Sequence, residues 1–400
     1  MSNITSLGLG SNTTERTLPT QMEATQPDKG LLDRKSDLTV GDKKEQAEFC
    51  NDDDWDKVRR HCKLGLGFLN NFSFDGFSEG GGKGGSLMTR SFDGSFLVKE
   101  MSRGDHESLL RHTTALVKKM IENDTLIVRI YAHFKKGQGI YVVMANCLPM
   151  GLKFTLLLDL KGCRDDKAMI LNGEKVPAIH KRCFSCLQCW YCCDMECCPC
   201  YPEERKVYYK GKVKAFTCDI VFTDQQADDI KKLIHCDAEF FRELQTMDYS
   251  LLVAYIELNE EDVKQGKISE EYKEAIRTCK YASVQDGTVR LYYLGIIDFL
   301  QDWNCKKDIA RCIKVCAPKP LSTIPPSLYA DQFDSNLGSR IKGGAKEFKL
   351  VAEVKSEQPG PIDAVEIEIT VGDRKSEVVE DEDGVKPTEP KEKPTAEQKP

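Results

Sequence analysis

The sequence predicts an α+β fold in which antiparallel strands joined by tight turns are flanked by amphipathic helices. The first observation is a pair of hairpin signals, Asp93-Gly94 and Asp286-Gly287, each lying between segments suited to strands. The second is helical periodicity, because apolar residues recur on one face of 104–122. The third is a capping box, Thr223-x-x-Gln226, which opens a further amphipathic helix.

Both ends of the chain differ in composition from its middle. Residues 1–48 are rich in Thr, Ser, Asp and Lys, and residues 351–400 form an acidic, proline-containing tail. Neither segment has enough large apolar residues to offset the entropy lost on ordering it. We therefore expect both ends to be disordered and the ordered part to span 49–350.

The net charge of −7 is unevenly distributed along the chain. The tail contains 7 Lys+Arg and 14 Asp+Glu, which amounts to −7 by itself, and residues 1–48 contribute −2. The segment 49–350 therefore carries +2. A nearly neutral domain must meet an anionic partner through a local patch, and nothing indicates a general nucleic-acid binder.

No membrane-crossing or lipid-anchoring signal is found in the sequence. The opening residues, MSNITSLGLGSNTTERT, lack the apolar stretch of a secretory signal, and no segment approaches the ~20 apolar residues of a bilayer span. Residue 2 is serine, whereas myristoylation requires glycine. We expect a protein that is soluble or lies on a membrane without crossing it.

Two acidic residues adjoin apolar segments. Asp248 lies in MDYSLLV, and Asp298 ends the apolar segment of YYLGIIDFL. An apolar run before a carboxylate indicates a buried strand with the acid at its tip. Two carboxylates in one cleft suit phosphoryl transfer, in which one accepts a proton from a hydroxyl and the other holds Mg²⁺ against a polyphosphate. The alternative is that each Asp only forms a turn.

A glycine-rich segment before the first hairpin is a candidate phosphate-binding loop. Glycines let the backbone approach a ligand and expose N–H groups to phosphate oxygens. Lys99 on the following strand could reach the α/β-phosphates of ATP, as in protein kinases. The spacing is not that of a Walker loop, and a flexible linker is the alternative. The loop residues are Gly82, Lys83, Gly84, Gly85 and Ser86.

Three further strand segments follow, LIVRIYAHF, GIYVVMANCL and FTLLLDLKGC. The second ends near Asn146, where a chain passing between two lobes could offer backbone groups to adenine. A core strand followed by a loop explains that segment equally well. The third places Asp159 and Lys161 on one face of an extended chain, where a surface ion pair is the alternative to a functional role.

Eight of the eighteen cysteines lie in residues 183–200. Without a secretory signal, disulfides are not expected. The CxxC spacing suits zinc, the aromatic and apolar neighbours suit a palmitoylated loop that touches a membrane, and an insertion with neither chemistry is the third alternative. The six histidines are scattered and predict no ligand or nucleophile set.

A short basic amphipathic segment, 302–320, follows Asp298. Its cysteine and isoleucine residues share one helical face, whereas Lys307, Arg311 and Lys314 lie towards the other. Such a segment packs on its own protein or lies on anionic lipid headgroups.

The order of these elements resembles that of the phosphatidylinositol phosphate kinase family over roughly 50–345. The similar blocks are GKGGS, the FLVK lysine, DLKG, MDYSLLV, YYLGIIDFLQDWN and STIPPSLYADQF. MDYSLL followed by GIID is highly specific, whereas the glycine-rich loop alone is not. The resemblance implies a two-lobed, kinase-like fold, with an N-lobe at about 49–148 and a C-lobe at about 149–350 that contains the Cys-rich insertion.

The resemblance also implies a reaction and residue roles. Family members phosphorylate the inositol ring of a phosphatidylinositol monophosphate, using ATP and Mg²⁺. By position, the glycine-rich loop would cover the ATP phosphates and Lys99 would bind them, with help from Lys161. Asp248 would lie at the substrate hydroxyl, and Asp298 would hold Mg²⁺.

The basic segment has a counterpart in the family. Lys306 and Lys307 stand where the activation loop of family members carries a basic pair that engages the membrane. With Arg311 and Lys314, they are expected to contact the anionic membrane that carries the substrate. The expected location is cytoplasmic, peripheral on the inner face of the plasma membrane. A homodimer is a further expectation, although the N-terminal region is too short for the extra strands that relatives use to dimerise.

Several residues depart from the family pattern. Cys163 replaces the usual Ser after DLKG, and Lys167 stands at the usual Arg. The helix acid that pairs with the ATP lysine would be Asp105, with Glu107 as a substitute. An active kinase making phosphatidylinositol 4,5-bisphosphate from the 4-phosphate is the leading hypothesis. A catalytically weak membrane adaptor and a soluble inositol phosphate kinase are the alternatives. The preference between the 4-phosphate and the 5-phosphate would reside in the loop before Ser322.

Overall fold

The computed structural model describes residues 39–40, 43–44, 47–79, 87–122, 124–177, 203–313 and 320–348. The chain divides into two compact units at Leu350. The second unit, Val351–Pro400, lies outside the described residues, as do the Cys-rich segment 183–200 and most of 1–48.

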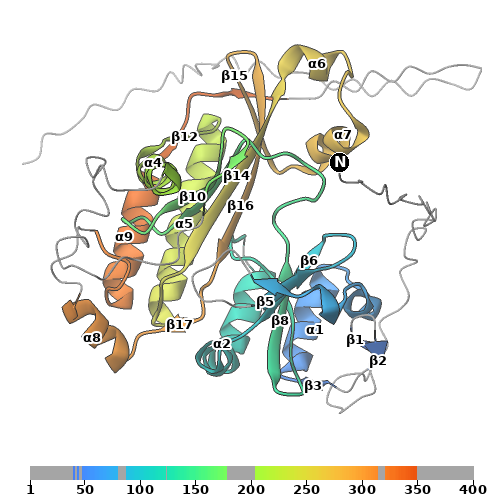
Figure 1. Ribbon diagram of the computed structural model, residues 1–400, viewed down its shortest axis with the longest axis vertical. Helices are drawn as coiled ribbons and strands as arrows, with labels where there is room; N and C mark the ends of the chain where they lie inside the picture. Colours follow the sequence, from blue (N-terminus) through green and yellow to red (C-terminus); the bar gives the residue numbers. More distant parts are fainter. Residues whose placement is uncertain are drawn as a thin grey trace, which may run out of the picture. The chain divides into compact units, whose positions relative to one another are not determined.

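A six-stranded antiparallel sheet forms the first lobe (Figure 1). Its strand order is β3-β7-β8-β6-β5-β4. The helices α1 (Asp52–His61) and α2 (Arg103–Glu122) pack on each other, and α2 confirms the helix predicted at 104–122. The strands are β3 (Glu48–Phe49), β4 (Ser78–Glu79), β5 (Leu87–Arg90), β6 (Phe96–Glu100), β7 (Ile130–Lys136) and β8 (Gly139–Ala145), with two 3₁₀ turns, η1 (Leu66–Asn70) and η2 (Phe74–Gly76), before β4.

A seven-stranded antiparallel sheet forms the second lobe, in the order β11-β10-β9-β14-β16-β15-β19. Its central strands β14 (Ser250–Asn259) and β16 (Thr288–Ile297) pair along their whole length. They contain the apolar segments that adjoin Asp248 and Asp298 in the sequence. The other strands are β9 (Leu156–Leu160), β10 (Lys167–Leu171), β11 (Glu174–Lys175), β15 (Tyr281–Gln285) and β19 (Lys346–Glu347).

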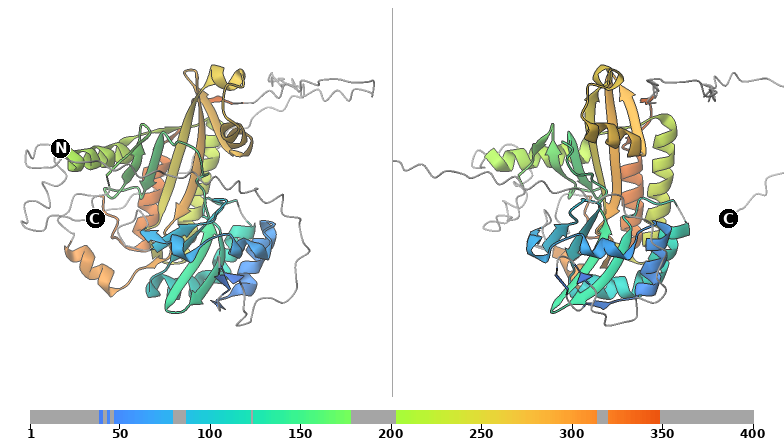
Figure 2. Two further views of the ribbon diagram at one scale, coloured as in Figure 1. Left: turned by 45° about the vertical axis from the view of Figure 1, so that its right-hand side comes forward. Right: turned by 90° about the vertical axis from the view of Figure 1, so that its right-hand side faces the viewer.

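Two long helices, α5 (Asp224–Glu243) and α9 (Pro326–Gly338), lie side by side along one face of this sheet (Figures 1 and 2). A third helix, α4 (Glu203–Thr217), packs on β10. The capping box predicted for α5 is confirmed, because the Thr223 hydroxyl accepts from the Gln226 N–H and the Gln226 side chain accepts from the Thr223 N–H.

The core between these helices and the sheet anchors the segment around Asp248. Tyr249, the next residue, is fully buried. Its ring lies 4.4 Å from that of Phe241 in α5 and 4.8 Å from those of Tyr329 and Phe333 in α9. The Tyr329 hydroxyl also donates to the Tyr249 carbonyl. Aromatic packing and a buried hydrogen bond therefore fix the backbone next to Asp248.

Both predicted hairpins form. β15 and β16 are joined at Asp286 and Gly287, whose φ angles of 51° and 73° are those of a type I′ turn. The turn between β5 and β6 is wider, and within it the Asp93 carboxylate accepts from the Ser95 N–H at 3.0 Å. Gly94 has a φ of 72°.

One predicted element is divided. The sequence suggests a single polar helix over 260–278, whereas the structure has α6 (Glu260–Lys264) and α7 (Glu270–Thr278). Gly266 adopts a φ of +67°, which ends α6 in a left-handed cap.

Short elements complete the fold. β12 (Ile220–Val221) pairs in parallel with β18 (Ile341–Lys342), and β13 (Thr246–Met247) pairs with β17 (Gln301–Asp302). A two-residue pair, β1 (Thr39–Val40) and β2 (Lys43–Lys44), and the helix α8 (Cys305–Ile313) are the remaining elements.

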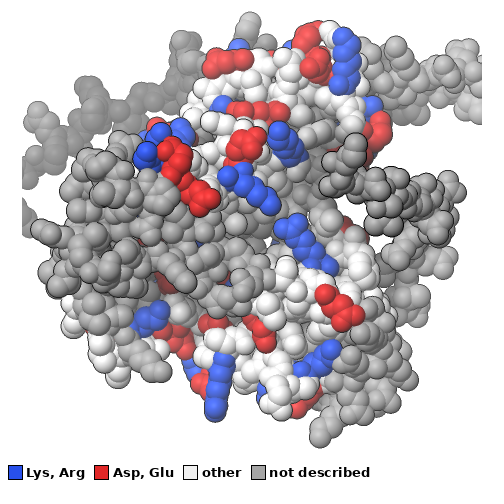
Figure 3. Space-filling view, in the orientation of Figure 1, with Lys and Arg blue, Asp and Glu red and all other residues white. Residues whose placement is uncertain are grey.

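The described residues contain neither a membrane-spanning helix nor, on the face drawn in Figure 3, a surface dominated by one charge. None of their helices combines the length and apolar character needed to cross a membrane. Basic and acidic side chains alternate over the face shown in Figure 3, with neither sign forming a continuous field. An anionic partner would therefore bind to a local group of basic side chains and not to a broad positive surface.

Candidate active site

The two acids leave the central strands at the same edge of the second sheet. The β14–β16 ladder ends at the partners Ser250 and Ile297. Asp248 lies two residues before the first of these and Asp298 one residue after the second. The antiparallel pairing of β14 and β16 therefore delivers both carboxylates to one place.

Both acids have a backbone conformation that is uncommon for residues other than glycine. The φ angles are 66° for Asp248 and 57° for Asp298. Asp tolerates the left-handed region better than most residues, and such conformations cluster at active sites. A turn alone would explain a positive φ angle at either acid. It would not explain why each acid also has a lysine partner.

Each acid is paired with a lysine. Lys99 Nζ, from β6 of the first lobe, lies 2.6 Å from Oδ1 of Asp298. Lys161 Nζ, at the end of β9, lies 2.7 Å from Oδ1 of Asp248 and 2.6 Å from its carbonyl oxygen. Because β9 pairs with β14 through Leu160 and Leu251, Lys161 emerges at the same edge as the acids. Four predicted site residues, Lys99, Lys161, Asp248 and Asp298, are therefore brought together.

The lysines keep Asp298 ionised. The Asp298 side chain is 50% exposed, but the walls of the site desolvate it, which on its own would raise its pKa. The charge and hydrogen bond of Lys99, followed by the charges of Lys161 and Lys167, outweigh this effect and lower the pKa below its usual value. Burial would lower the pKa of Lys161, but the charges of Asp248 and Asp159 raise it.

Asp159 and Lys161, which the sequence places on one face of an extended chain, do not form an ion pair with each other. Asp159 is cross-strand partner to Lys167 on β10 and accepts from its Nζ at 2.9 Å. Lys161 points to Asp248 instead. Lys167 is therefore held beside the site by a carboxylate of β9.

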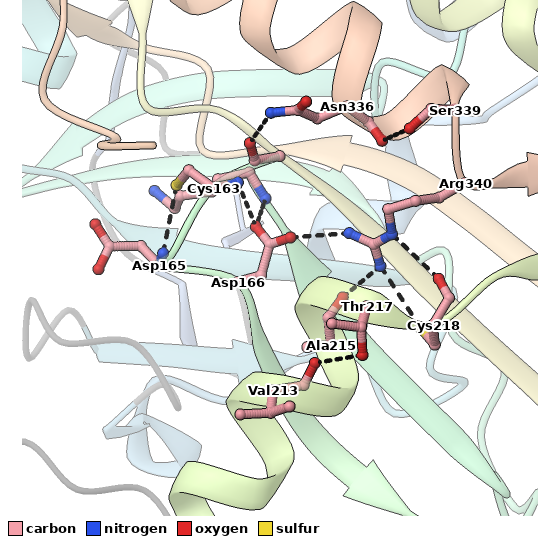
Figure 4. A network of polar contacts seen from close by, with 12 residues as sticks. Cys163, Asp165, Asp166, Val213, Ala215, Thr217, Cys218, Asn336, Ser339 and Arg340 are labelled. Atoms are coloured by element: carbon pink, nitrogen blue, oxygen red, sulfur yellow. Dashed lines mark hydrogen bonds and ion pairs between the residues drawn. The ribbon is translucent and has the colours of Figure 1, made fainter. Parts of the chain in front are cut away.

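An anchor that the sequence did not reveal holds the loop after β9. Oδ1 of Asp166 accepts from the backbone N–H groups of Lys161 (2.6 Å) and Cys163 (3.1 Å). Its Oδ2 accepts from Arg340 Nη1 at 2.9 Å, as Figure 4 shows. Arg340 also donates to the carbonyls of Ala215 and Cys218. Because 174 residues separate Asp166 from Arg340, no local pattern predicts this pair.

A second anchor acts on the carbonyl side of the same loop. Asn336 Nδ2 of α9 donates to the Gly162 carbonyl at 2.7 Å. Gly162 has a φ of +67°, and a Cβ there would lie 3.1 Å from the Gln332 carbonyl oxygen. Glycine is therefore required for the close approach of this loop to α9. Ser322 follows the loop expected to set isomer preference, and its hydroxyl donates to Asp165.

The expected partner of Lys99 on helix α2 is not used. The Asp105 carboxylate accepts from the Ser102 hydroxyl at 2.8 Å, and Glu107 pairs with Arg103 at 3.0 Å. Both acids lie in the first turns of α2, where these local partners are within reach, and Lys99 binds Asp298 instead. The expectation of a lysine–helix acid pair is therefore wrong for this conformation.

Helix α2 is instead fastened to the segment after Asp298. The Asp302 carboxylate accepts from the Ser108 hydroxyl at 2.9 Å and forms an ion pair with Arg111. Asp302 lies in β17, so this contact links α2 directly to the second lobe.

Asn146 has a structural role in the segment that joins the two sheets. Its backbone N–H donates to the Ser95 carbonyl at 2.9 Å, and its side-chain amide donates to the Gly94 carbonyl at 2.8 Å. Its Oδ1 accepts from the Leu148 N–H. These bonds fasten the segment to the β5–β6 turn, and a contact between Asn146 and adenine stays a prediction.

A cavity of about 480 Å³ adjoins this segment. Its walls include the apolar side chains of Leu148, Met150 and Met169, together with the basic side chains of Arg90 and Lys167. Apolar walls with a few polar groups are typical of small-molecule sites.

Some predicted site residues lie outside the described residues. These include the glycine-rich loop, Gly82 to Ser86, and Lys314. The Lys306 side chain is likewise not described. The backbone of Lys306, Lys307 and Arg311 belongs to α8, as the amphipathic pattern predicts, and Ile309 on this helix is 63% exposed.

A two-lobed arrangement with lysine–carboxylate pairs at the strand ends defines the class of kinase-like phosphotransferase sites. A family model described as phosphatidylinositol-4-phosphate 5-kinase matches residues 76–285 and 257–339. The chain belongs to this family of phosphatidylinositol phosphate kinases.

Two relatives illustrate the match. A phosphatidylinositol 4-phosphate 5-kinase of Plasmodium falciparum is 24% identical over 294 residues, which cover 65% of this chain and 15% of that protein. A phosphatidylinositol 5-phosphate 4-kinase type-2 gamma of Danio rerio is 21% identical over 314 residues, which cover 64% of this chain and 67% of that protein. The chain therefore spans only a small part of the first relative's length.

Proposed function

We propose that this protein transfers the γ-phosphoryl group of ATP to the inositol ring of a phosphatidylinositol monophosphate, and that it converts the 4-phosphate to the 4,5-bisphosphate. Membership of the kinase family supports the reaction class. The observation that carries the proposal is the set formed by Lys99–Asp298 and Lys161–Asp248, in which two acids and two lysines meet at one sheet edge.

The residues divide into groups that handle the phosphates and groups that handle the hydroxyl. Lys99 is positioned by Asp298 and supplies a positive charge for the ATP phosphates. Asp298 is ionised and half exposed, which fits a ligand for Mg²⁺. Mg²⁺ bound there would neutralise charge that develops on the phosphoryl oxygens.

Asp248 and Lys161 act at the acceptor side. A carboxylate within hydrogen-bond reach of the inositol hydroxyl can accept its proton as the phosphoryl group arrives. The Lys161 ammonium contacts both Oδ1 and the carbonyl oxygen of Asp248, so it fixes the orientation of this carboxylate. Its positive charge also favours a phosphate group nearby.

Helix α8 supports an encounter with the lipid surface. Ile309 projects 63% exposed, and Arg311 on the same helix is exposed as well. A short helix with apolar and basic side chains suits an anionic membrane interface. We infer that the protein works in the cytoplasm, at the inner face of the plasma membrane, where such headgroups are found.

The test is transfer of labelled phosphate from ATP to vesicles that carry each phosphatidylinositol monophosphate isomer separately. The key variant is Asp298→Asn, and Asp286→Asn is its matched control. Asp286 has a φ of 51°, close to the 57° of Asp298, and Asn tolerates this region as well as Asp does. The two substitutions therefore make equal demands on the backbone, but only one removes a site carboxylate.

Three outcomes distinguish the proposals. Product from the 4-phosphate that disappears with Asp298→Asn and persists with Asp286→Asn supports the reaction and the isomer. Product only from the 5-phosphate overturns the isomer assignment and keeps the chemistry. Retained turnover in Asp298→Asn overturns the metal assignment.

A membrane adaptor that binds phosphoinositides without turning them over is the second candidate. The observation that favours it is the engagement of Asp105 and Glu107 with Ser102 and Arg103 rather than with Lys99. An adaptor would bind vesicles normally in the assay above and yield no product from any isomer.

A further inference from the structure

Three potential metal ligands meet in the first lobe, apart from the residues of the active site. Cys50, His106 and His133 each offer a ligand atom, and these atoms all lie within 4.8 Å of one another. Nδ1 of His106 is 2.8 Å from Nε2 of His133. The histidines look scattered in the sequence, but the fold brings these two together beside a thiol.

Two strands and a helix assemble the cluster. β3 runs antiparallel to β7, with Phe49 opposite Phe134. The Cys50 N–H donates to the His133 carbonyl at 2.8 Å, so Cys50 continues this ladder opposite His133. Cross-strand partners point to the same face of a sheet, and His106, in the second turn of α2, contacts His133 there.

The polar atoms of this cluster are not satisfied by the protein alone. His133 is fully buried, and its Nδ1 has no hydrogen-bond partner among the residues that the structure describes. Among the described residues, the Cys50 thiol makes only a long hydrogen bond, 4.0 Å to the Glu48 carbonyl. Buried polar groups are normally paired, so the unpaired Nδ1 of His133 indicates a missing partner.

We propose that Cys50, His106 and His133 bind a zinc ion that fastens β3 and α2 to β7. One thiolate and two imidazoles form a donor set suited to this borderline-soft ion. Zinc bonds of about 2.0–2.3 Å place tetrahedral ligand atoms roughly 3.2–3.7 Å apart, a spacing that fits within the 4.8 Å that encloses the three ligand atoms here. The Cys50 thiol releases its proton to solvent on binding, because the thiolate is the ligand.

The fourth coordination position has a source close by. A cavity of about 530 Å³ is lined by His106, Glu100 and Glu107, among others. A water molecule or a carboxylate from this cavity would complete the tetrahedron. None of these ligands is one of the four residues at the Lys99–Asp298 and Lys161–Asp248 pairs.

The test is the number of zinc equivalents bound by the full-length chain. Reduced, metal-free protein is titrated with Zn²⁺ in competition with a chromophoric chelator. The variants are Cys50→Ser and His106→Gln, and the matched controls are Cys62→Ser, on a half-buried thiol, and His112→Gln, on the same helix as His106. The cysteines of 183–200 are present in every protein, so their contribution cancels in the comparison.

The expected result is that Cys50→Ser and His106→Gln each lose a single zinc equivalent while both controls retain the wild-type number. Zn²⁺ should also raise the Tm of the wild type and the controls more than that of Cys50→Ser. Equal numbers of equivalents in all five proteins would overturn the proposal.

A measurement on the wild-type chain covers the case in which the variants fail to fold. Saturating Zn²⁺ should shift the ring ¹⁵N resonances of His106 and His133 and leave those of His112 and His235 in place. Unshifted rings at His106 and His133 would equally overturn the proposal.

Discussion

The Lys99 ammonium lies 2.6 Å from the Asp298 carboxylate, although 199 residues separate the two in the chain. Lys99 belongs to the sheet of the first lobe and Asp298 to the end of the central ladder of the second. The ion pair therefore connects the two sheets at the point where Lys161 and Asp248 also meet. A cationic and an anionic side chain are thus held opposite each other at this point.

The first prediction concerns the electrostatic effect of Lys99 on Asp298. Lys99→Met should lower kcat/KM for ATP by roughly 10²–10³-fold, the typical effect of removing one group that stabilises transition-state charge. The Lys99 charge helps to hold the Asp298 pKa below its usual value, so its removal should raise that pKa. In the proposed mechanism the ionised form of Asp298 holds Mg²⁺, so the acidic limb of the pH profile should move to higher pH.

The measurement is kcat/KM against pH for the residual activity of Lys99→Met. Lys118→Met is the control, since Lys118 lies on α2 with its side chain 71% exposed. An acidic limb that stays in place would show that Asp298 does not control that part of the profile.

The second prediction concerns the pair formed by Asp166 and Arg340. Asp166→Asn keeps the shape of the side chain but replaces one carboxylate oxygen with an amide N–H₂, so at least one hydrogen bond from Lys161, Cys163 or Arg340 is lost. A buried donor left without its acceptor destabilises by about 1–3 kcal/mol. The loop that carries Lys161 should also loosen, since Asp166 accepts from its backbone N–H. Urea unfolding and turnover of the variant, compared with Asp165→Asn, would measure both effects.

The same pair makes stability depend on pH. Burial raises the pKa of Asp166 from 3.8 to about 6, against the opposing effects of hydrogen bonds and Arg340. Between these pH values the folded state binds more protons than the unfolded state. The contribution of Asp166 to the free energy of unfolding is therefore greatest below about pH 4. It should fall as the pH rises to about 6 and then level off. The measurement is the free energy of unfolding of the wild type minus that of Asp166→Asn, between about pH 4 and pH 6. A difference that rises with pH would contradict the raised pKa of Asp166.

The central strands, the helices α2 and α5 and the two acids could be predicted from the sequence because local patterns encode them. Apolar runs, the Asp286-Gly287 turn and the Thr223 capping box each act over a few residues. The network around Asp166 could not be predicted from the sequence, because its partner Arg340 is distant in the chain and no short pattern marks a buried ion pair. The lysine–acid pairing at Lys99 was mispredicted for a related reason: the family pattern names residue types, whereas the conformation decides which acid the ammonium reaches.

The third prediction concerns the membrane contact of α8. Arg311→Glu should lower product formation on anionic vesicles roughly tenfold at low salt, because each basic residue near such a surface contributes about 1 kcal/mol. The difference from wild type should shrink as salt is added, since the Debye length falls to about 8 Å at physiological ionic strength. The control is Arg277→Glu on α7, where the arginine pairs with Glu274.

A salt-independent effect, or an equal loss in the control, would show that α8 does not make the contact. Activity on a short-chain, soluble substrate should be unaffected in both variants, which separates membrane binding from catalysis.

The fourth prediction concerns two glycines with the same backbone conformation. Gly162 and Gly266 both have a φ of +67°, but only at Gly162 would a Cβ meet other atoms, the nearest being the Gln332 carbonyl oxygen at 3.1 Å. Substitution by alanine should lower the free energy of unfolding by about 1–2 kcal/mol at either position, because alanine disfavours the left-handed conformation. At Gly162 the crowding against α9 adds to this and pushes the loop away.

The functional consequence separates the two positions further. Gly162 is bonded to Asn336 and follows Lys161, whose ammonium holds Asp248. A displaced loop moves that ammonium, so Gly162→Ala should reduce kcat, whereas Gly266→Ala, at the end of α6, should leave kcat unchanged. Urea unfolding and turnover of both variants provide the comparison. Equal losses of stability and equal turnover would mean that the contact with α9 does not position Lys161.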